Sequence, residues 1–208
     1  LVGCNWERPV YIAVSVGTDG RFCFQNNFRQ EGMLLRITPF NTTDLDARMD
    51  TERTFDSMVR KFKWGGVEDP GVYMDETARR MYTASRMYFA LLAQELIREG
   101  KKEQAREVLD YCLEVIPHES IPFEFADGSY RMAESYYQLG ETAKADAVIG
   151  QLATKSVEYI TWYLSMNKYQ WYAVSNECMT QLYMLNEENK LMKKYKSPQL
   201  DTYWQVFE

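Results

Sequence analysis

Two segments in the middle of the chain repeat each other, and this repetition constrains the fold more than any other feature of the sequence. The stretches EGKKEQAREVL (99–109) and LGETAKADAVI (139–149) align without a gap. Small and apolar residues recur at matching offsets around them: Phe89, Leu92, Ala93, Leu96, Gly100, Ala105, Leu109, Cys112 and Pro117 in the first unit, and Met132, Ala133, Tyr136, Gly140, Ala145, Ile149 and Leu152 in the second. Each unit therefore predicts two helices joined by a turn at a glycine.

This spacing is the tetratricopeptide pattern, a helical hairpin repeat of about 34 residues. Small residues stand where the two helices of a pair cross closely, so we expect four alanines to be buried: Ala93, Ala105, Ala133 and Ala145. The turn glycines at 100 and 140 are separated by more than one repeat length, which makes HESIPFEF (118–125) an insertion between the units. A generic antiparallel helical hairpin would imitate part of this pattern and is the alternative.

The residues before the repeats predict a different kind of structure. β-Branched and aromatic residues at 9–16, 21–24 and 33–38 predict three short strands, with Asp19-Gly20 as a hairpin turn between the first two. An amphipathic helix is expected at 50–62. Longer helices are expected at 75–99, 101–116, 126–139, 141–165 and 168–195, with the tail after Pro198 folded back onto them.

We therefore predict a mainly α protein, built of tetratricopeptide-like antiparallel helical hairpins with a small N-terminal β element. Residues 1–70 would form a strand-bearing segment with one amphipathic helix, and residues 71–208 would form the helical domain. Helical units of this kind bury a core by stacking. They usually present a surface to a partner rather than catalyse a reaction.

Composition narrows the classes of partner. The 208 residues carry a formal net charge of −6 and show no basic stripe, which argues against nucleic acid. No stretch reaches the roughly 18 consecutive apolar residues of a membrane span, so we expect no transmembrane segment in this chain. Because the chain begins with Leu1 rather than Met, we expect it to be a fragment or a processed product of a longer protein.

The four cysteines, at 4, 23, 112 and 178, lie far apart and form no CxxC motif, so the sequence gives no support for a zinc site. Cys112 and Cys178 fall on apolar helix stripes, where we expect them to be small buried hydrophobic residues. A disulfide between Cys4 and Cys23 would require the first two predicted strands to pair, and the alternative is two free thiols.

No arrangement of residues in the sequence predicts catalysis. The single histidine, His118, lies in the insertion and has no partner for a triad or a metal site. Glu68, Asp69, Asp75 and Glu76 lie close together but lack the spacing of a calcium loop, and they fit turn and helix-start positions instead. We therefore predict no catalytic, metal-binding or cofactor-binding residues and no cofactor.

A partner surface is the remaining prediction. If the units stack, the first helix of each pair lines a concave face. The residues expected on that face are Gln94, Arg98, Tyr130, Glu134, Tyr137 and Gln138. An ordinary solvated helix face is the alternative for each of them.

Four motifs carry a resemblance that covers nearly the whole chain: NWERPVY (5–11), QEGMLLRI (30–37), KFKWG (61–65) and DETARRM (75–81). In this order they resemble the C-terminal periplasmic, tetratricopeptide-like region of a bacterial multi-pass membrane protein family, formerly a domain of unknown function. That family is similar to membrane glycosyltransferases of the protein O-mannosyltransferase type. The cysteine within GCNWERPVY and the tail after Leu191 depart from the pattern.

The resemblance implies a noncatalytic soluble module on the periplasmic face of a bacterial inner membrane, whose catalytic acids would lie in the membrane half outside this chain. Its partner would be a protein, a peptide, or that membrane half of the same polypeptide. One alternative is a carbohydrate-binding or catalytic accessory part that uses the N-terminal sheet with Trp6 and Trp64. Another is a purely structural cap.

Overall fold

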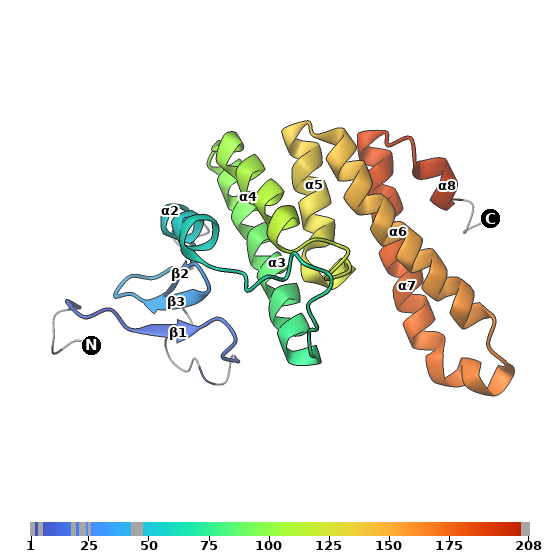
Figure 1. Ribbon diagram of the computed structural model, residues 1–208, viewed down its shortest axis with the longest axis horizontal. Helices are drawn as coiled ribbons and strands as arrows, with labels where there is room; N and C mark the ends of the chain where they lie inside the picture. Colours follow the sequence, from blue (N-terminus) through green and yellow to red (C-terminus); the bar gives the residue numbers. More distant parts are fainter. Residues whose placement is uncertain are drawn as a thin grey trace.

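The computed structural model describes residues 3, 6–17, 20, 24, 26–42 and 48–204 of the chain. In these residues the protein is mainly helical, with one small antiparallel sheet at the N-terminal end (Figure 1). The sheet lies beside the first helices, and the later helices follow one another across the molecule to the C-terminus (Figure 1). The predicted combination of a helical body and a small β element is therefore confirmed.

The sheet has three strands, β1 (Tyr11–Ala13), β2 (Phe28–Glu31) and β3 (Leu34–Ile37), in the order β1-β3-β2. Gly32, at the first position of the two-residue β2–β3 loop, has φ +64°, which such hairpin loops require of that position. Both outer strands pair antiparallel with β3. The first and third predicted strands are confirmed in shortened form.

The structure contains a strand that the sequence did not predict, because the strand between β1 and β3 in sequence is β2 at Phe28–Glu31. Of the segment predicted at 21–24, only Phe24 lies within the described residues, and it belongs to no strand. Asp19, Cys4 and Cys23 also lie outside the described residues, so the hairpin turn and the disulfide stay predictions.

The amphipathic helix begins as α2 (Thr51–Phe55) and continues as the π-helix η3 (Asp56–Lys61). The Asp50 side chain accepts a hydrogen bond from the backbone N–H of Arg53 at 3.0 Å and so caps the helix start. The backbone N–H of Gly32 donates to Thr54 Oγ1 at 3.0 Å, which fastens the sheet to α2. The predicted helix at 50–62 is confirmed, although its π-helical second half was not foreseen.

The helical body closely follows the predicted boundaries. Its helices are α3 (Glu76–Arg98), α4 (Lys102–Val115), the short 3₁₀-helix η4 (Phe125–Asp127), α5 (Ser129–Leu139), α6 (Thr142–Leu164), α7 (Lys168–Tyr195) and α8 (Leu200–Trp204). The tail folds back as predicted, because the Tyr203 hydroxyl on α8 donates to the backbone oxygen of Gly150 on α6 at 3.0 Å.

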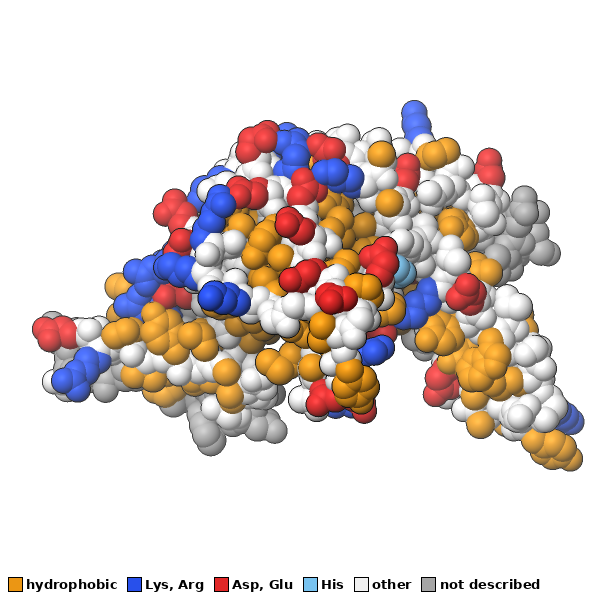
Figure 2. All heavy atoms as spheres, viewed as in Figure 1, with side chains coloured by type: hydrophobic (Ala, Val, Ile, Leu, Met, Phe, Trp, Pro, Cys, Tyr) orange, Lys and Arg blue, Asp and Glu red, His pale blue; other side chains and the backbone are white. Residues whose placement is uncertain are grey.

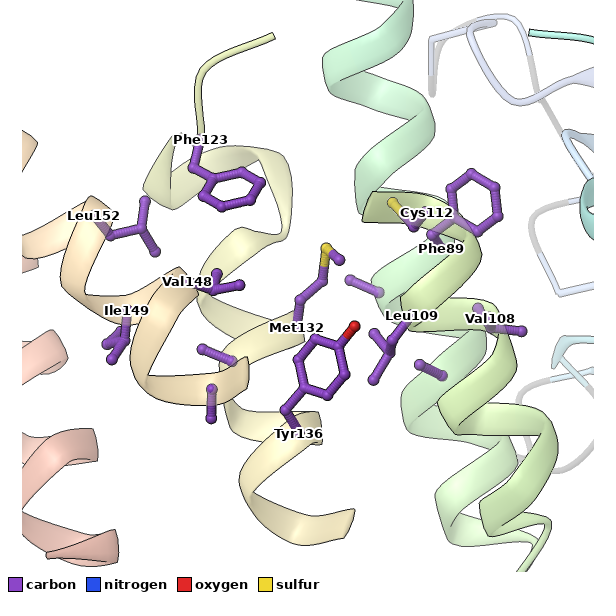
Figure 3. Packing of buried hydrophobic residues seen from close by; sticks show 14 of the residues in the cluster. Phe89, Val108, Leu109, Cys112, Phe123, Met132, Tyr136, Val148, Ile149 and Leu152 are labelled. Carbon is purple, nitrogen blue, oxygen red and sulfur yellow. The ribbon is translucent and has the colours of Figure 1, made fainter. Parts of the chain in front are cut away.

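One hydrophobic core runs through the molecule. The four alanines at the expected helix crossings are fully buried, as predicted. In Figure 3, Met132 and Tyr136 of α5 lie between Leu109 of α4 and Val148 of α6, so α5 is packed from both sides. Cys112 and Cys178 are buried free thiols. The buried cluster extends on both sides of residue 70, where the domain boundary stays a prediction.

A buried arginine fixes the insertion between the repeated units. Arg86 on α3 is fully buried and forms an ion pair with the fully buried Asp127 in η4. Its guanidinium also donates to the backbone oxygens of Ile121 at 2.6 Å and Ile116 at 3.1 Å, and it lies 4.8 Å from the Phe123 ring centre. The segment between α4 and α5 therefore wraps around one cation.

The start of α5 approaches α3 so closely that only glycine fits there. Gly128 has φ +93°, and a Cβ atom at this position would lie 2.8 Å from the Met87 Cα. Asp127 Oδ1 accepts hydrogen bonds from the Ser129 backbone N–H at 2.8 Å and from its hydroxyl at 2.6 Å. One carboxylate thus neutralises Arg86 and holds the first turn of α5.

We expect Arg86→Met to lower the free energy of unfolding by about 3–5 kcal/mol, because it leaves the Asp127 carboxylate buried without its cation. Arg79→Met, which removes an exposed arginine from the same helix, is the matched control and should change stability little. Urea unfolding of both variants measures the difference. Equal stabilities would show that the buried pair does not hold the insertion in place.

Candidate functional site

A groove runs along the first half of α3. Its floor is formed by the half-buried side chains of Met87, Tyr88 and Leu91, and its volume is about 640 Å³. One wall is the segment that leads into α5, which contributes Glu124 and Ala126. The groove therefore has an apolar floor and a second wall whose position depends on the buried Arg86.

Charged residues of both signs surround this floor. Arg79, Arg80 and Glu76 of α3 line the groove together with Glu124 on the opposite wall. The Arg80 guanidinium forms an ion pair with Glu76 at 2.5 Å, and both side chains are largely exposed. Exposed pairs of this kind contribute little to stability, so their groups can exchange partners with a bound ligand at low cost.

Two of the predicted contact residues continue the groove along α3. Gln94 lies two turns after Met87 and accepts a hydrogen bond from Arg131 of α5 at 3.2 Å. Arg98 follows one turn later and donates to Glu95 at 3.0 Å. The predicted face of α3 is therefore in register with the groove and is joined to α5.

The residues predicted on α5 have different surroundings. Tyr130 packs on Phe125 with ring centres 4.9 Å apart, and burial together with the charge of Glu134 raises the pKa of its hydroxyl to about 12. Glu134 forms an ion pair with Lys194 of α7 at 3.5 Å. Gln138 is exposed. These three side chains remain candidates for contact with a partner.

The placement of Tyr137 on an open contact face is corrected, because its side chain is buried rather than presented to a partner. Its ring stacks on Tyr195 of α7 with centres 4.5 Å apart, and its hydroxyl donates to Asp146 at 2.5 Å. The same Asp146 oxygen accepts from the Ser197 hydroxyl at 2.6 Å. Tyr137 therefore holds α7 and the following turn against α5 and α6.

A second, smaller pocket of about 250 Å³ lies on the sheet. Trp6 lines it together with four arginines and two acids, namely Arg8, Arg29, Arg36, Arg53, Glu31 and Asp50. Burial opposes ionisation of Glu31, but hydrogen bonds from Tyr11, Arg53 and Arg36 outweigh it and lower the pKa of this carboxyl. With four cations against two anions, the pocket is locally basic in an acidic chain.

The two tryptophans that the sequence singled out do not share a site. Trp64 packs on Phe89 of α3, with ring centres 5.1 Å apart, and lines a cavity beside Met33 and Tyr82. Trp6 is half-buried in the sheet pocket and has φ +63°, a conformation that bulky residues rarely adopt. Trp64 therefore joins the strand-bearing segment to the helices, whereas Trp6 lines a charged concavity.

The structure assigns a packing role to the lone histidine. His118 Nδ1 accepts a hydrogen bond from the Phe123 backbone N–H at 3.0 Å, and the two rings pack edge to face. Burial is the main cause that lowers the pKa of His118, which favours the neutral ring. Within the described part of the chain, no group of three His, Cys, Asp or Glu side chains is arranged to hold a metal ion.

A buried carboxyl on α7 was not found from the sequence. Glu188 is fully buried and its Oε1 accepts from the Ser156 hydroxyl at 3.3 Å, while Oε2 has no hydrogen-bond partner. Burial raises the pKa of Glu188 to about 7. A glutamate within a helix is normally exposed, so the sequence did not predict the burial of Glu188, which only the tertiary structure shows.

The comparisons with known proteins reach only the N-terminal quarter of the chain. Residues 1–55 match the family model of TMEM260-associated domain 2, which indicates similarity to a domain associated with a membrane protein. Every residue that lines the sheet pocket falls within this segment. No curated protein and no solved structure matches the chain. In the part of the chain that the structure describes, no helix has the length and apolar character needed to cross a membrane.

We expect Glu188 to make the protein less stable as pH rises from about 4.5 to 7, in opposition to His118, whose lowered pKa adds stability as pH rises. The folded state keeps a proton on Glu188 across this range, whereas the unfolded state releases it, so the stabilisation is complete below the unfolded pKa and is lost as pH passes the folded pKa. The loss should amount to about 3 kcal/mol at most. Urea unfolding across this pH range measures it.

Glu188→Gln should remove this pH dependence, because an amide does not titrate. Glu187→Gln is the matched control at the neighbouring position, where the carboxylate pairs with Lys190 at 2.7 Å, and it should keep the wild-type slope. A Glu188→Gln variant with an unchanged slope would contradict the assignment.

Proposed function

We propose that this chain is a noncatalytic binding module of a membrane-associated protein and that the groove on α3 holds a segment of a protein partner. The observation that carries the proposal is the groove itself. It combines a floor of Met87, Tyr88 and Leu91 with charges of both signs at its edges. An apolar floor favours burial of side chains from a partner, and the charged edges orient its backbone and polar groups.

The tetratricopeptide interpretation supports the same surface. The repeated pattern, the buried alanines and the α3–α5 contact all agree with helical hairpins whose first helices form one continuous face. Proteins of this architecture bind extended segments along such a face. Gln94, Arg98 and Arg131 would then extend the groove toward α5.

The location of the module is a further part of the proposal. The four sequence motifs favour the periplasmic face of a bacterial inner membrane, beside a glycosyltransferase-like membrane part. The match of residues 1–55 to a membrane-protein-associated domain agrees with a membrane setting. The partner would then be another protein or the membrane half of the same polypeptide.

A second candidate function is carbohydrate binding at the sheet pocket. An aromatic ring beside hydrogen-bonding and charged groups in a concavity is typical of sites that hold polar ligands, and Trp6 with Arg8 and Arg29 provides this combination. The excess of arginine favours a sugar that carries an acidic group. Trp64 does not contribute, because its ring packs against α3.

A larger hollow of about 820 Å³ on α6 is an alternative binding site for the partner. It is lined by Gln151, Thr154 and Lys155 of α6 and by Tyr203 of α8. The Tyr203 hydroxyl lies 2.9 Å from the Thr154 hydroxyl, so the C-terminal segment of the chain already covers one side of it. We therefore assign the partner to the α3 groove and use the α6 hollow as the control.

Selection of linear peptides from a displayed random library against the 208-residue chain tests the groove. We expect Met87→Glu to weaken the selected peptides by about tenfold or more, because it places a charge in the apolar floor. Gln151→Glu, the same new residue in the α6 hollow, should leave their affinity unchanged. Titration of both variants, each checked for an unchanged melting temperature, measures the difference.

If the affinity of the peptides falls with Gln151→Glu and not with Met87→Glu, the binding site is the α6 hollow rather than the α3 groove. If no peptide binds either surface, the groove proposal is wrong, and carbohydrate binding at the sheet pocket and a structural cap are the remaining functions. The same preparation should neither transfer nor hydrolyse sugar from activated or lipid-linked donors, with or without divalent metal. Turnover that is lost on changing one Asp or Glu to its amide would contradict the noncatalytic assignment.

For the sheet pocket, we expect Trp6→Ala to abolish binding of acidic sugars while the fold is retained, because the half-buried ring lines the pocket without belonging to the core cluster. Trp204→Ala, which removes a tryptophan at the far end of the chain, is the control. Glycan titration and thermal melting of both variants distinguish the roles. Loss of the fold in Trp6→Ala would show that this ring is structural.

A further inference from the structure

The outer half of the α6–α7 hairpin is depleted in charge. Between Glu158 and Glu177 the chain contains no acid, and its single cation is Lys168, next to the turn between the helices. Six aromatic residues fall in this stretch: Tyr159, Trp162, Tyr163, Tyr169, Trp171 and Tyr172. Since charged residues make up 26% of the whole chain, this segment is distinct in its chemistry.

Four of the six aromatic side chains are exposed, whereas Tyr163 and Trp171 are half-buried. The exposed fraction is 87% for Tyr169, 72% for Tyr172, 65% for Leu164 and 55% for Trp162. The two helices extend beyond the rest of the body as an arm (Figure 1), and Figure 2 shows hydrophobic side chains gathered along the arm and at its end. Large exposed apolar patches mark surfaces that contact a protein or a membrane.

The turn at the end of the arm satisfies several of its own polar groups. The Asn167 side chain accepts from the backbone N–H of Gln170 at 3.1 Å, and the Gln170 side chain accepts from the Asn167 N–H at 3.2 Å. The Ser165 hydroxyl donates to the Trp162 backbone oxygen at 2.7 Å. A turn with these internal hydrogen bonds loses less free energy on leaving water than an uncapped one.

The exposed residues do not form one flat face. Trp162 and Leu164 are separated by about 200° around α6, given 3.6 residues per turn, so they point to opposite sides of the helix. The most exposed residues of α7, Tyr169 and Tyr172, come from the other helix of the hairpin. A folded protein would have to enclose the end of the arm to cover all four, whereas a fluid lipid interface surrounds an inserted tip without such a shape.

We propose that the tip of the α6–α7 hairpin inserts into the interfacial layer of a lipid bilayer. Tyrosine and tryptophan are enriched at this depth, where their rings meet acyl chains and their polar atoms meet water and headgroups. From Tyr159 to Ser165, α6 rises about 9 Å, so even an upright tip of this length is short beside the roughly 30 Å hydrocarbon core. Glu158 and Glu177 limit the insertion, and Lys168 lies where it can contact anionic headgroups.

This contact is separate from the proposed partner groove. The groove lies on α3 and η4, whereas the tip is formed by the last turns of α6 and the first turns of α7. Neither the aromatic residues nor Lys168 lines the groove. Failure of one proposal therefore leaves the other standing.

Cosedimentation of the 208-residue chain with phosphatidylcholine vesicles, with and without phosphatidylglycerol, tests the insertion. We expect binding to both vesicles, because exposed aromatic side chains rather than charge carry the contact. Tyr169→Glu should lower the partition coefficient by about tenfold or more, since it places an acid at the tip. Tyr73→Glu is the matched control, because Tyr73 is 90% exposed in the loop before α3, and it should leave binding unchanged.

Absence of vesicle binding by the unchanged chain would overturn the proposal, as would equal losses for the two variants. Sedimentation velocity without lipid measures whether the chain self-associates. If the chain self-associates and Tyr169→Glu makes it monomeric without any vesicle effect, the tip is a contact between two copies of the chain. Circular dichroism of both variants should show the helix content of the unchanged protein.

Discussion

The buried ion pair of Arg86 and Asp127 is the interaction on which the shape of the helical body depends. A guanidinium transferred from water into a protein interior is costly unless its hydrogen bonds are replaced. Here a carboxylate and three backbone oxygens accept from its two terminal nitrogens, whereas Nε has no partner. The insertion between α4 and α5 cannot move away without leaving this charge unpaired. One wall of the α3 groove is therefore fixed by electrostatics rather than by apolar packing alone.

The strand-bearing segment is attached to this body by a few specific contacts. Trp64 packs on Phe89, and Thr51 donates to Glu99 at the end of α3 at 2.8 Å. Within the segment, the Gly32 N–H binds Thr54 and so joins the sheet to α2. A three-stranded sheet with such short strands needs this support, because it cannot bury enough apolar surface alone. The segment that matches a membrane-protein-associated domain is thus joined to the helices through Thr51 and through Trp64, which follows it in the sequence.

Three surfaces of different chemistry result from one continuous core. The α3 groove offers an apolar floor with mixed charges, the sheet pocket offers arginines around Trp6, and the α6–α7 arm offers aromatic side chains with one lysine. Across the described residues, the buried polar groups serve packing, as Arg86 and His118 do, and none converges with others on a metal site.

The sequence by itself determined the helices, because helical periodicity and capping are set by residues a few positions apart. It located α3 to α7 closely and identified the buried alanines. Only the tertiary structure decided the rest. β2 has a polar sequence that becomes a strand by pairing with β3, and Tyr137 is buried because α7 covers it. An arginine or a glutamate within a helix predicts an exposed side chain, so the burial of Arg86 and Glu188 follows from distant segments that close over them.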